Sequence, residues 1–130
     1  MYLLDTDILI DLCRNRFHLQ DRVSAAGIKN CVISEISLAE FYVGVYKSRN
    51  PRLEKEASFI EETFTVIPIS GALKTYARLR AQLEQQGVRL DTMDLFIAAT
   101  AIENGHTLVS HNTRHFSRIP DLQLVDWLEG

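Results

Sequence analysis

Short apolar runs alternate with helix-like segments along this chain of 130 residues. The runs have the length and composition of buried strands, and parallel strands need helical crossovers of the kind found between them. The pattern therefore predicts an α/β fold of three layers, in which helices cover both faces of a central, mostly parallel sheet of about five strands. The expected strands lie at residues 2–4, 31–33, 65–67, 107–109 and 122–125.

Local capping signals place the helices between these strands. One helix is expected to begin after Asp5, a second after Ser34, and a third at Pro51, which suits a first helical turn. Ser70 is expected to cap a long amphipathic helix. A very apolar helix should begin at Asp91 or Thr92 and end near residues 104–105.

Size and composition narrow the possibilities. A chain of this length predicts a single domain over residues 1–130, with no internal repeat or linker. The net charge of −3 argues against a protein that coats nucleic acid nonspecifically, but it allows a nuclease whose acids gather in one pocket. There is no membrane-length apolar run and no basic signal-peptide head, so we expect a soluble, cytoplasmic protein that does not associate with membranes. Cys13 and Cys31 have no CxxC spacing and are expected to be free thiols.

Polar residues occur where an apolar α/β chain would not need them. Asp5 ends the first apolar run, Asp94 opens the apolar helix, and Asn112 and His115 follow the run at 107–109. Ligands of parallel sheets bind at the carboxyl ends of the strands, so these residues are expected to share one cleft. Carboxylates crowded together are costly unless a hard cation neutralises them, which predicts a metal-dependent phosphodiesterase. The purely structural alternatives are a helix cap for Asp5 and an acid in the first helical turn for Asp94.

Glu40 is a further candidate because of its place on a helix. The spacing of four apolar residues predicts an inward stripe that contains Glu40. An ionised carboxylate on a core face would cost several kcal/mol if it were unpaired. We therefore expect Glu40 to take part in the acidic site, with a salt bridge or a place at the edge of the stripe as the alternatives. The four residues that define the stripe are Ile36, Ala39, Val43 and Tyr46.

These residues carry a family resemblance. The opening YLLDTD at residues 2–7 resembles the start of PIN-domain proteins, and ISEISLAE at 33–40 resembles their second motif. DLFIAA at 94–99 resembles the third motif and LVSHNTRHF at 108–116 the fourth, with a matching tail at 119–127. The order and spacing extend over the whole chain. Within PIN domains it is most similar to the VapC toxins of VapBC toxin–antitoxin pairs.

The resemblance implies an endoribonuclease toxin that cuts structured RNA with a metal-activated water. Asp5 and Asp94 would hold one or two Mg²⁺ or Mn²⁺ ions, directly or through waters, and Glu40 would complete the site. Arg114 would contact a phosphate of the RNA. The implied protein partner is a small VapB-like antitoxin.

Two departures from the family pattern concern the site. Asp7 stands where Asn is common. His115 stands where the family usually has Asp or Glu, so either His115 or Asn112 would supply the fourth ligand. A histidine there predicts a preference for Mn²⁺ over Mg²⁺.

Two other functions stay open on the sequence. A catalytically impaired PIN-like scaffold that binds RNA or protein is the first, and His115 favours it. A phospho-receiver domain is the second, but it would need a lysine after its last strand, and the chain has none after Lys74.

One helix has more aromatic residues than a single buried face can hold. Phe41, Tyr42 and Tyr46 cannot all point into the core. We expect the surplus to form a homodimer surface or a groove for an amphipathic segment of the antitoxin.

Overall fold

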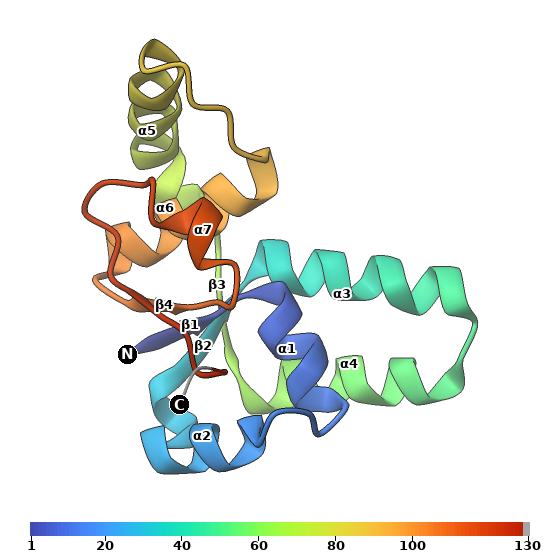
Figure 1. Cartoon of the computed structure of the whole chain (residues 1–130). Coiled ribbons are helices and arrows are strands. Elements are labelled where there is room, and N and C mark those ends of the chain that lie inside the picture. The colour runs from blue at the N-terminus through green and yellow to red at the C-terminus, as the bar shows by residue number, and fades with distance from the viewer. Residues whose placement is uncertain (129–130) are drawn as a thin grey trace.

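The computed structural model describes residues 1–128. Its five strands form one sheet in the order β3-β2-β1-β4-β5, and every neighbouring pair is parallel (Figure 1). This confirms the predicted α/β class and the parallel sheet. The strands are β1 (Tyr2–Leu4), β2 (Cys31–Ser34), β3 (Thr65–Ile67), β4 (Thr107–Val109) and β5 (Leu124–Val125).

The last strand is shorter than the expected 122–125. Asp121 has a positive φ of 66° and lies in a turn, so the chain has only just reversed when Leu122 is reached. Pairing is limited to the two residues of β5, with a bond from the Leu108 N–H to the Gln123 carbonyl just before them.

Helices cover both faces of the sheet. Neighbouring residues of a strand point to opposite faces, and accordingly Leu4 belongs to one apolar core and Leu3 to the other. The first core is formed with α1 (Thr6–Cys13), α2 (Leu19–Ala26), α3 (Glu35–Ser48) and α4 (Pro51–Thr63). The second core is formed with α5 (Leu73–Gln85), α6 (Thr92–Asn104) and the short α7 (Thr113–Phe116). In Figure 1, α3 and α4 extend side by side away from the sheet, and no helix of residues 1–128 is long and apolar enough to cross a membrane.

Most of the predicted helix starts are confirmed by side-chain caps. The Ser34 hydroxyl accepts a bond from the Ile36 N–H, and Asp91 accepts bonds from the first turn of α6. Pro51 is at the start of α4, as expected. The Ser70 prediction is wrong: residues Ser70–Ala72 form a 3-10 turn, and α5 begins afterwards without a side-chain cap. The Ala72 N–H donates to the Ile69 carbonyl instead, so a backbone bond closes the turn.

The stripe predicted on α3 is also wrong. The buried face of this helix is rotated away from the predicted stripe, because α3 packs on α1 and α4. The residues that are buried are Ser37, Phe41 and Val45. Of the predicted stripe, Ala39, Val43 and Tyr46 are exposed. Glu40 is therefore half-buried at the edge of the buried face, which was the alternative left open for it.

Candidate active site

Asp5 lies at the carboxyl end of the central strand. Its N–H donates to the Val109 carbonyl at 3.0 Å, which fixes it between β1 and β4. The residue is 5% exposed, and its carboxylate accepts two bonds, from the Thr6 N–H at 2.8 Å and from the Ser110 hydroxyl at 2.8 Å. Ser110 is fully buried, and its oxygen also accepts a bond from the Asn112 N–H at 3.0 Å. Two adjacent strand ends thus hold one carboxylate in a fixed position.

The electrostatic environment of Asp5 is unfavourable for a charge. Burial raises the pKa of Asp5 from 3.8 to about 6, although the hydrogen bonds from Ser110 and Thr6 act in the opposite direction. The negative charges of Asp94 and Asp7 raise the pKa further. Asp5 is therefore a buried acid whose ionised form is destabilised, and a nearby positive charge would relieve this.

Asp94 belongs to the same group of charges. It lies in the first turn of α6, where its N–H donates to the capping carboxylate of Asp91. Burial raises the pKa of Asp94, and the charges of Asp91 and Glu40 raise it further, while His115 lowers it. Acids from three separate segments are thus close enough to influence one another.

Glu40 is linked to Asp5 through Thr6. The Thr6 hydroxyl donates to Glu40 Oε1 at 2.7 Å and lies 3.0 Å from the hydroxyl oxygen of Ser37. Because Thr6 also gives its N–H to Asp5, one residue positions two carboxylates. The sequence analysis missed the roles of Thr6, Ser37 and Ser110. The available signal was a small hydroxyl residue directly beside a predicted acid or directly after a strand.

The remaining predicted residues lie around α7. Asn112 precedes this helix, is half-buried, and makes no capping bond with its side chain. His115 is exposed but close enough to Asp94 to affect its pKa. Arg114 is exposed, and within residues 1–128 its side chain has no ion-pair partner.

The comparison with known proteins identifies the family. A model of the PIN domain matches residues 2–122. Ribonuclease VapC2 of Haemophilus influenzae is 33% identical over 132 residues, which cover 98% of both chains. The chain belongs to the VapC proteins of the PIN-domain family. A protein of Shigella flexneri named tRNA(fMet)-specific endonuclease VapC is 32% identical over 131 residues and 97% of each chain.

Solved structures agree with this assignment. VapBC2 from Rickettsia felis, bound to a DNA fragment from its promoter, superposes with a TM-score of 0.88 and 31% identity, covering 97% of this chain and 98% of that one. VapBC-1 from nontypeable Haemophilus influenzae gives a TM-score of 0.87 and 31% identity over 98% of each chain. The resemblance to VapC toxins drawn from the motifs is confirmed.

The site of this VapC-type chain suits a hard cation in its chemistry. Its carboxylates supply only oxygen donors, as Mg²⁺ and Mn²⁺ prefer, and their mutual repulsion is what a cation would relieve. Within residues 1–128, no three His, Cys, Asp or Glu side chains lie close enough together to hold an ion by themselves. Coordination by Asp5 and Asp94 would therefore include water, as is usual for Mg²⁺.

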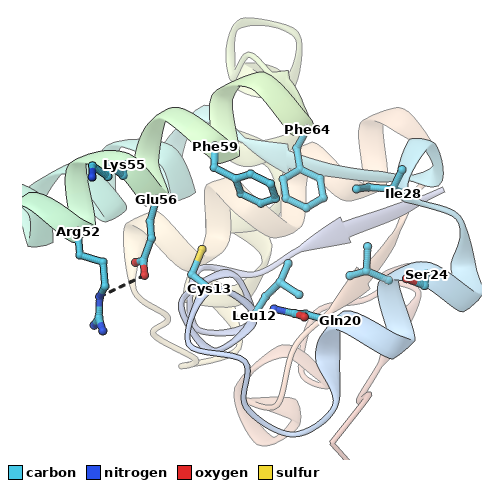
Figure 2. Close-up of a pocket in the computed structure, with 11 residues that line it drawn as sticks. Leu12, Cys13, Gln20, Ser24, Ile28, Arg52, Lys55, Glu56, Phe59 and Phe64 are labelled. Carbon is cyan, nitrogen blue, oxygen red and sulfur yellow. Dashed lines mark ion pairs between the residues drawn. The ribbon is translucent and has the colours of Figure 1, made fainter.

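Hollows of the surface lie on different sides of α1, and two of them differ in what lines them. The hollow in Figure 2, of about 440 Å³, lies between α1, α2 and α4 and is lined mainly by apolar groups such as Phe59 and Phe64. Its charged groups are Lys55 and the ion pair of Arg52 with Glu56 at 3.5 Å. We call it the apolar hollow. A second hollow, of about 730 Å³, is lined by Asp7 and Asn112 at the acidic site.

Proposed function

We propose that this chain is a metal-dependent endoribonuclease, the toxin of a type II toxin–antitoxin pair. The proposal rests on the position of Asp5. It is a buried carboxylate fixed between two strand ends, and the negative charges of Asp94 and Asp7 raise its pKa. Asp5 and Asp94 would hold one or two Mg²⁺ or Mn²⁺ ions, with Glu40 completing the site. When bound, such an ion supplies the Lewis acidity for hydrolysis of a phosphodiester by water.

The residues of the chain orient the acids for this chemistry. Ser110 and the N–H of Thr6 fix both oxygens of Asp5, and the Thr6 hydroxyl fixes one oxygen of Glu40. Fixed carboxylates need no reorganisation when the reaction begins, which is a main source of catalytic rate. Arg114 is exposed on α7 and would contact a phosphate of the bound RNA.

The substrate we propose is structured RNA cut in a single-stranded loop. The Shigella flexneri relative is named for a transfer RNA, and 97% of this chain aligns with it. Proteins that recognise RNA by sequence bind unpaired bases, because the grooves of an RNA helix are hard to read. Sequencing of the RNA ends produced after induction in cells would identify which RNA is cut.

The partner we propose is a small VapB-like antitoxin, since the structural neighbours are VapBC complexes. The apolar hollow suits the apolar face of an amphipathic segment, because Phe59 and Ile28 on its lining are about half exposed, at 54% and 47%. A homodimer would use the outer face of α3. There Tyr46 is 76% exposed and stacks on Tyr42, whereas Phe41 points into the core.

The nuclease proposal is tested with purified protein and a labelled hairpin RNA. Cleavage is measured in EDTA and after addition of Mg²⁺ or Mn²⁺, for the wild type, Asp5→Asn, Asp94→Asn and the control Asp121→Asn. Asp121 is an exposed acid away from the site, in a left-handed conformation that asparagine tolerates. We expect metal-dependent cleavage by the wild type and the control alone. A wild type that binds the RNA but never cuts it would instead support the catalytically impaired scaffold.

A further inference from the structure

The larger hollow is connected to the candidate site through two of its lining residues. The charge of Asp7 acts on Asp5, and Asn112 donates its N–H to the Ser110 hydroxyl that bonds to Asp5. The hollow lies against one face of α1, which presents Asp7, Ile10 and Asp11 at helical spacing, and continues past Arg14, directly after the helix, to the turn between α1 and α2. Its other wall is the loop after β4, with His111 and Asn112. At about 730 Å³, it has the size of a small-molecule site and could hold a nucleotide. We call it the polar hollow.

An aromatic ring is held on the surface of the polar hollow. Phe17 is 54% exposed and has a positive φ of 57°, a backbone conformation that bulky residues avoid. Asn15 and His18 on either side also have a positive φ. The fold gains little from an exposed phenyl ring in a strained turn, whereas an exposed aromatic face is what unpaired bases stack on.

The opposite wall presents hydrogen-bonding groups in a fixed position. Nδ1 of His111 lies 2.9 Å from Oδ2 of Asp126, a carboxylate whose side chain is only 6% exposed. The other oxygen of Asp126 accepts the Leu128 N–H at 2.9 Å, so the carboxylate itself cannot turn. The His111 ring is thereby oriented, and its Nε2 is available to a ligand. The amide of Asn112, which bonds to no other side chain within residues 1–128, can donate and accept at the same wall.

The charges around the polar hollow favour a neutral group inside it. Asp7 is negative, and Asp11 is neutralised by Arg16 at 3.7 Å. Arg14 forms no ion pair within residues 1–128 and is exposed at the rim, where a backbone phosphate can reach it. A base suits these walls, and a phosphate suits the rim.

We propose that the polar hollow binds one unpaired RNA base next to the scissile phosphate. Phe17 stacks on the base, His111 and Asn112 contact its edge, and Arg14 contacts a flanking phosphate. This inference rests on the proposed ribonuclease function, and it gives the RNA a site that would determine specificity. Of the residues that form this site, only Asn112 is also a candidate metal ligand.

The test is the binding of short fluorescein-labelled RNAs in EDTA, measured by fluorescence anisotropy with the full chain. The probes are homopolymers of each base and an oligomer of the same length without bases. Phe17→Leu should weaken binding of the base-bearing RNA about tenfold and leave the abasic oligomer unchanged. Phe17→Tyr should retain the wild-type affinity. Phe59→Leu, which changes an equally exposed phenylalanine in the apolar hollow, should change neither.

Two further variants separate base reading from phosphate binding. His111→Ala should alter the order of affinities among the four homopolymers, because an edge contact is lost. Arg14→Gln should weaken all probes, the abasic one included, and reduce the salt slope by about one, whereas Arg78→Gln should not. Arg78 is an exposed arginine of α5, outside the hollow.

The outcomes distinguish this inference from the function on which it rests. Equal binding of every probe by Phe17→Leu and the wild type would overturn the inference. So would a Phe17→Leu variant that loses affinity for the antitoxin alone, since the hollow would then be a peptide site. Absence of cleavage with any metal, together with base-dependent binding through Phe17, would overturn the proposed nuclease and support the base site.

Discussion

The two hollows that flank α1 differ in the groups that line them, although one short helix supplies residues to both. Leu12 and Cys13 line the apolar hollow, and Asp7, Asp11 and Arg14 line the polar one. Burial and the charge of Glu56 raise the pKa of the Cys13 thiol to about 11, so it stays protonated and behaves as an apolar group. Binding in the apolar hollow would gain free energy mainly by covering apolar area, whereas the polar hollow offers oriented charges and hydrogen bonds. The proposed functions follow this difference, with the antitoxin on one side of α1 and the RNA on the other.

The largest expected effect is the difference in cleavage rate between a variant of the acidic site and a variant of the apolar hollow. Asp94→Asn should reduce the rate of RNA cleavage on the order of a thousandfold, as expected when a group that supports charge at the reacting centre is removed. Phe59→Ser in the apolar hollow should leave the rate within about twofold, as it touches no site residue. Initial rates at saturating metal decide this. A loss of rate in both variants would show that the two hollows are not independent.

The second effect concerns stability in the absence of metal. The pKa of Asp5 is raised to about 6 in the folded protein, so its ionised form destabilises the fold at neutral pH and its protonated form does not. The difference from the ordinary value of 3.8 corresponds to roughly 3 kcal/mol. The contribution of Asp5 to the free energy of unfolding of the metal-free wild type should therefore fall as pH rises from about 4 to about 7.

The variant Asp5→Asn should lose most of this pH dependence and be more stable than the wild type at neutral pH in EDTA. Urea unfolding at several pH values measures both quantities, with Asp121→Asn as the matched control. If Asp5→Asn is instead clearly less stable at every pH, Asp5 serves mainly as the cap of α1, and its charge does not destabilise the fold.

The fold could be predicted from the sequence wherever local signals determine it. Strand ends and caps such as Ser34 and Asp91 depend on neighbouring residues, and the structure has them as expected. The helix α2 was not foreseen, because its buried residues are only Leu19 and Val23 and its N-cap, His18, makes no side-chain bond. The local signals that it does have are weaker: Leu19 and Val23 at i, i+4 spacing, and Gly27 at its C-cap.

The candidate site shows the same limit. The positions of Asp5 and Asp94 beside a strand end and in a first helical turn were foreseen, because both follow from local patterns. The reason given for Glu40 was wrong, since the buried face of α3 is set by contacts with α1 and α4 rather than by the apolar spacing of the helix alone. The bond between Ser110 and Asp5 joins residues 105 positions apart, and only the pairing of β1 with β4 brings them together.

A third prediction concerns the apolar hollow. Phe59→Ser should weaken binding of the cognate antitoxin about tenfold, because truncating an aromatic anchor typically costs 1–2 kcal/mol or more. Phe17→Leu should leave this affinity unchanged, as Phe17 lines the polar hollow. Isothermal titration with the antitoxin from the neighbouring reading frame measures both. An unchanged affinity in Phe59→Ser would remove the apolar hollow as the antitoxin site.

The smallest expected effect lies at His115, an exposed residue whose charge still influences Asp94. An imidazole is a better partner for Mn²⁺ than for Mg²⁺, whereas a carboxylate suits Mg²⁺. His115→Asp should therefore shift the ratio of the Mn²⁺ and Mg²⁺ cleavage rates toward Mg²⁺ by a factor of about two to ten. This factor does not exceed the effect expected from changing a group that contacts the ligands of a metal rather than the metal itself. Arg114→Gln is the matched control on the same helix, since it should raise KM for RNA and leave the metal ratio alone. If His115→Ala and His115→Asp both keep the wild-type ratio, the site needs only Asp5, Glu40 and Asp94, and the departure of this chain from the family pattern has no consequence for metal choice.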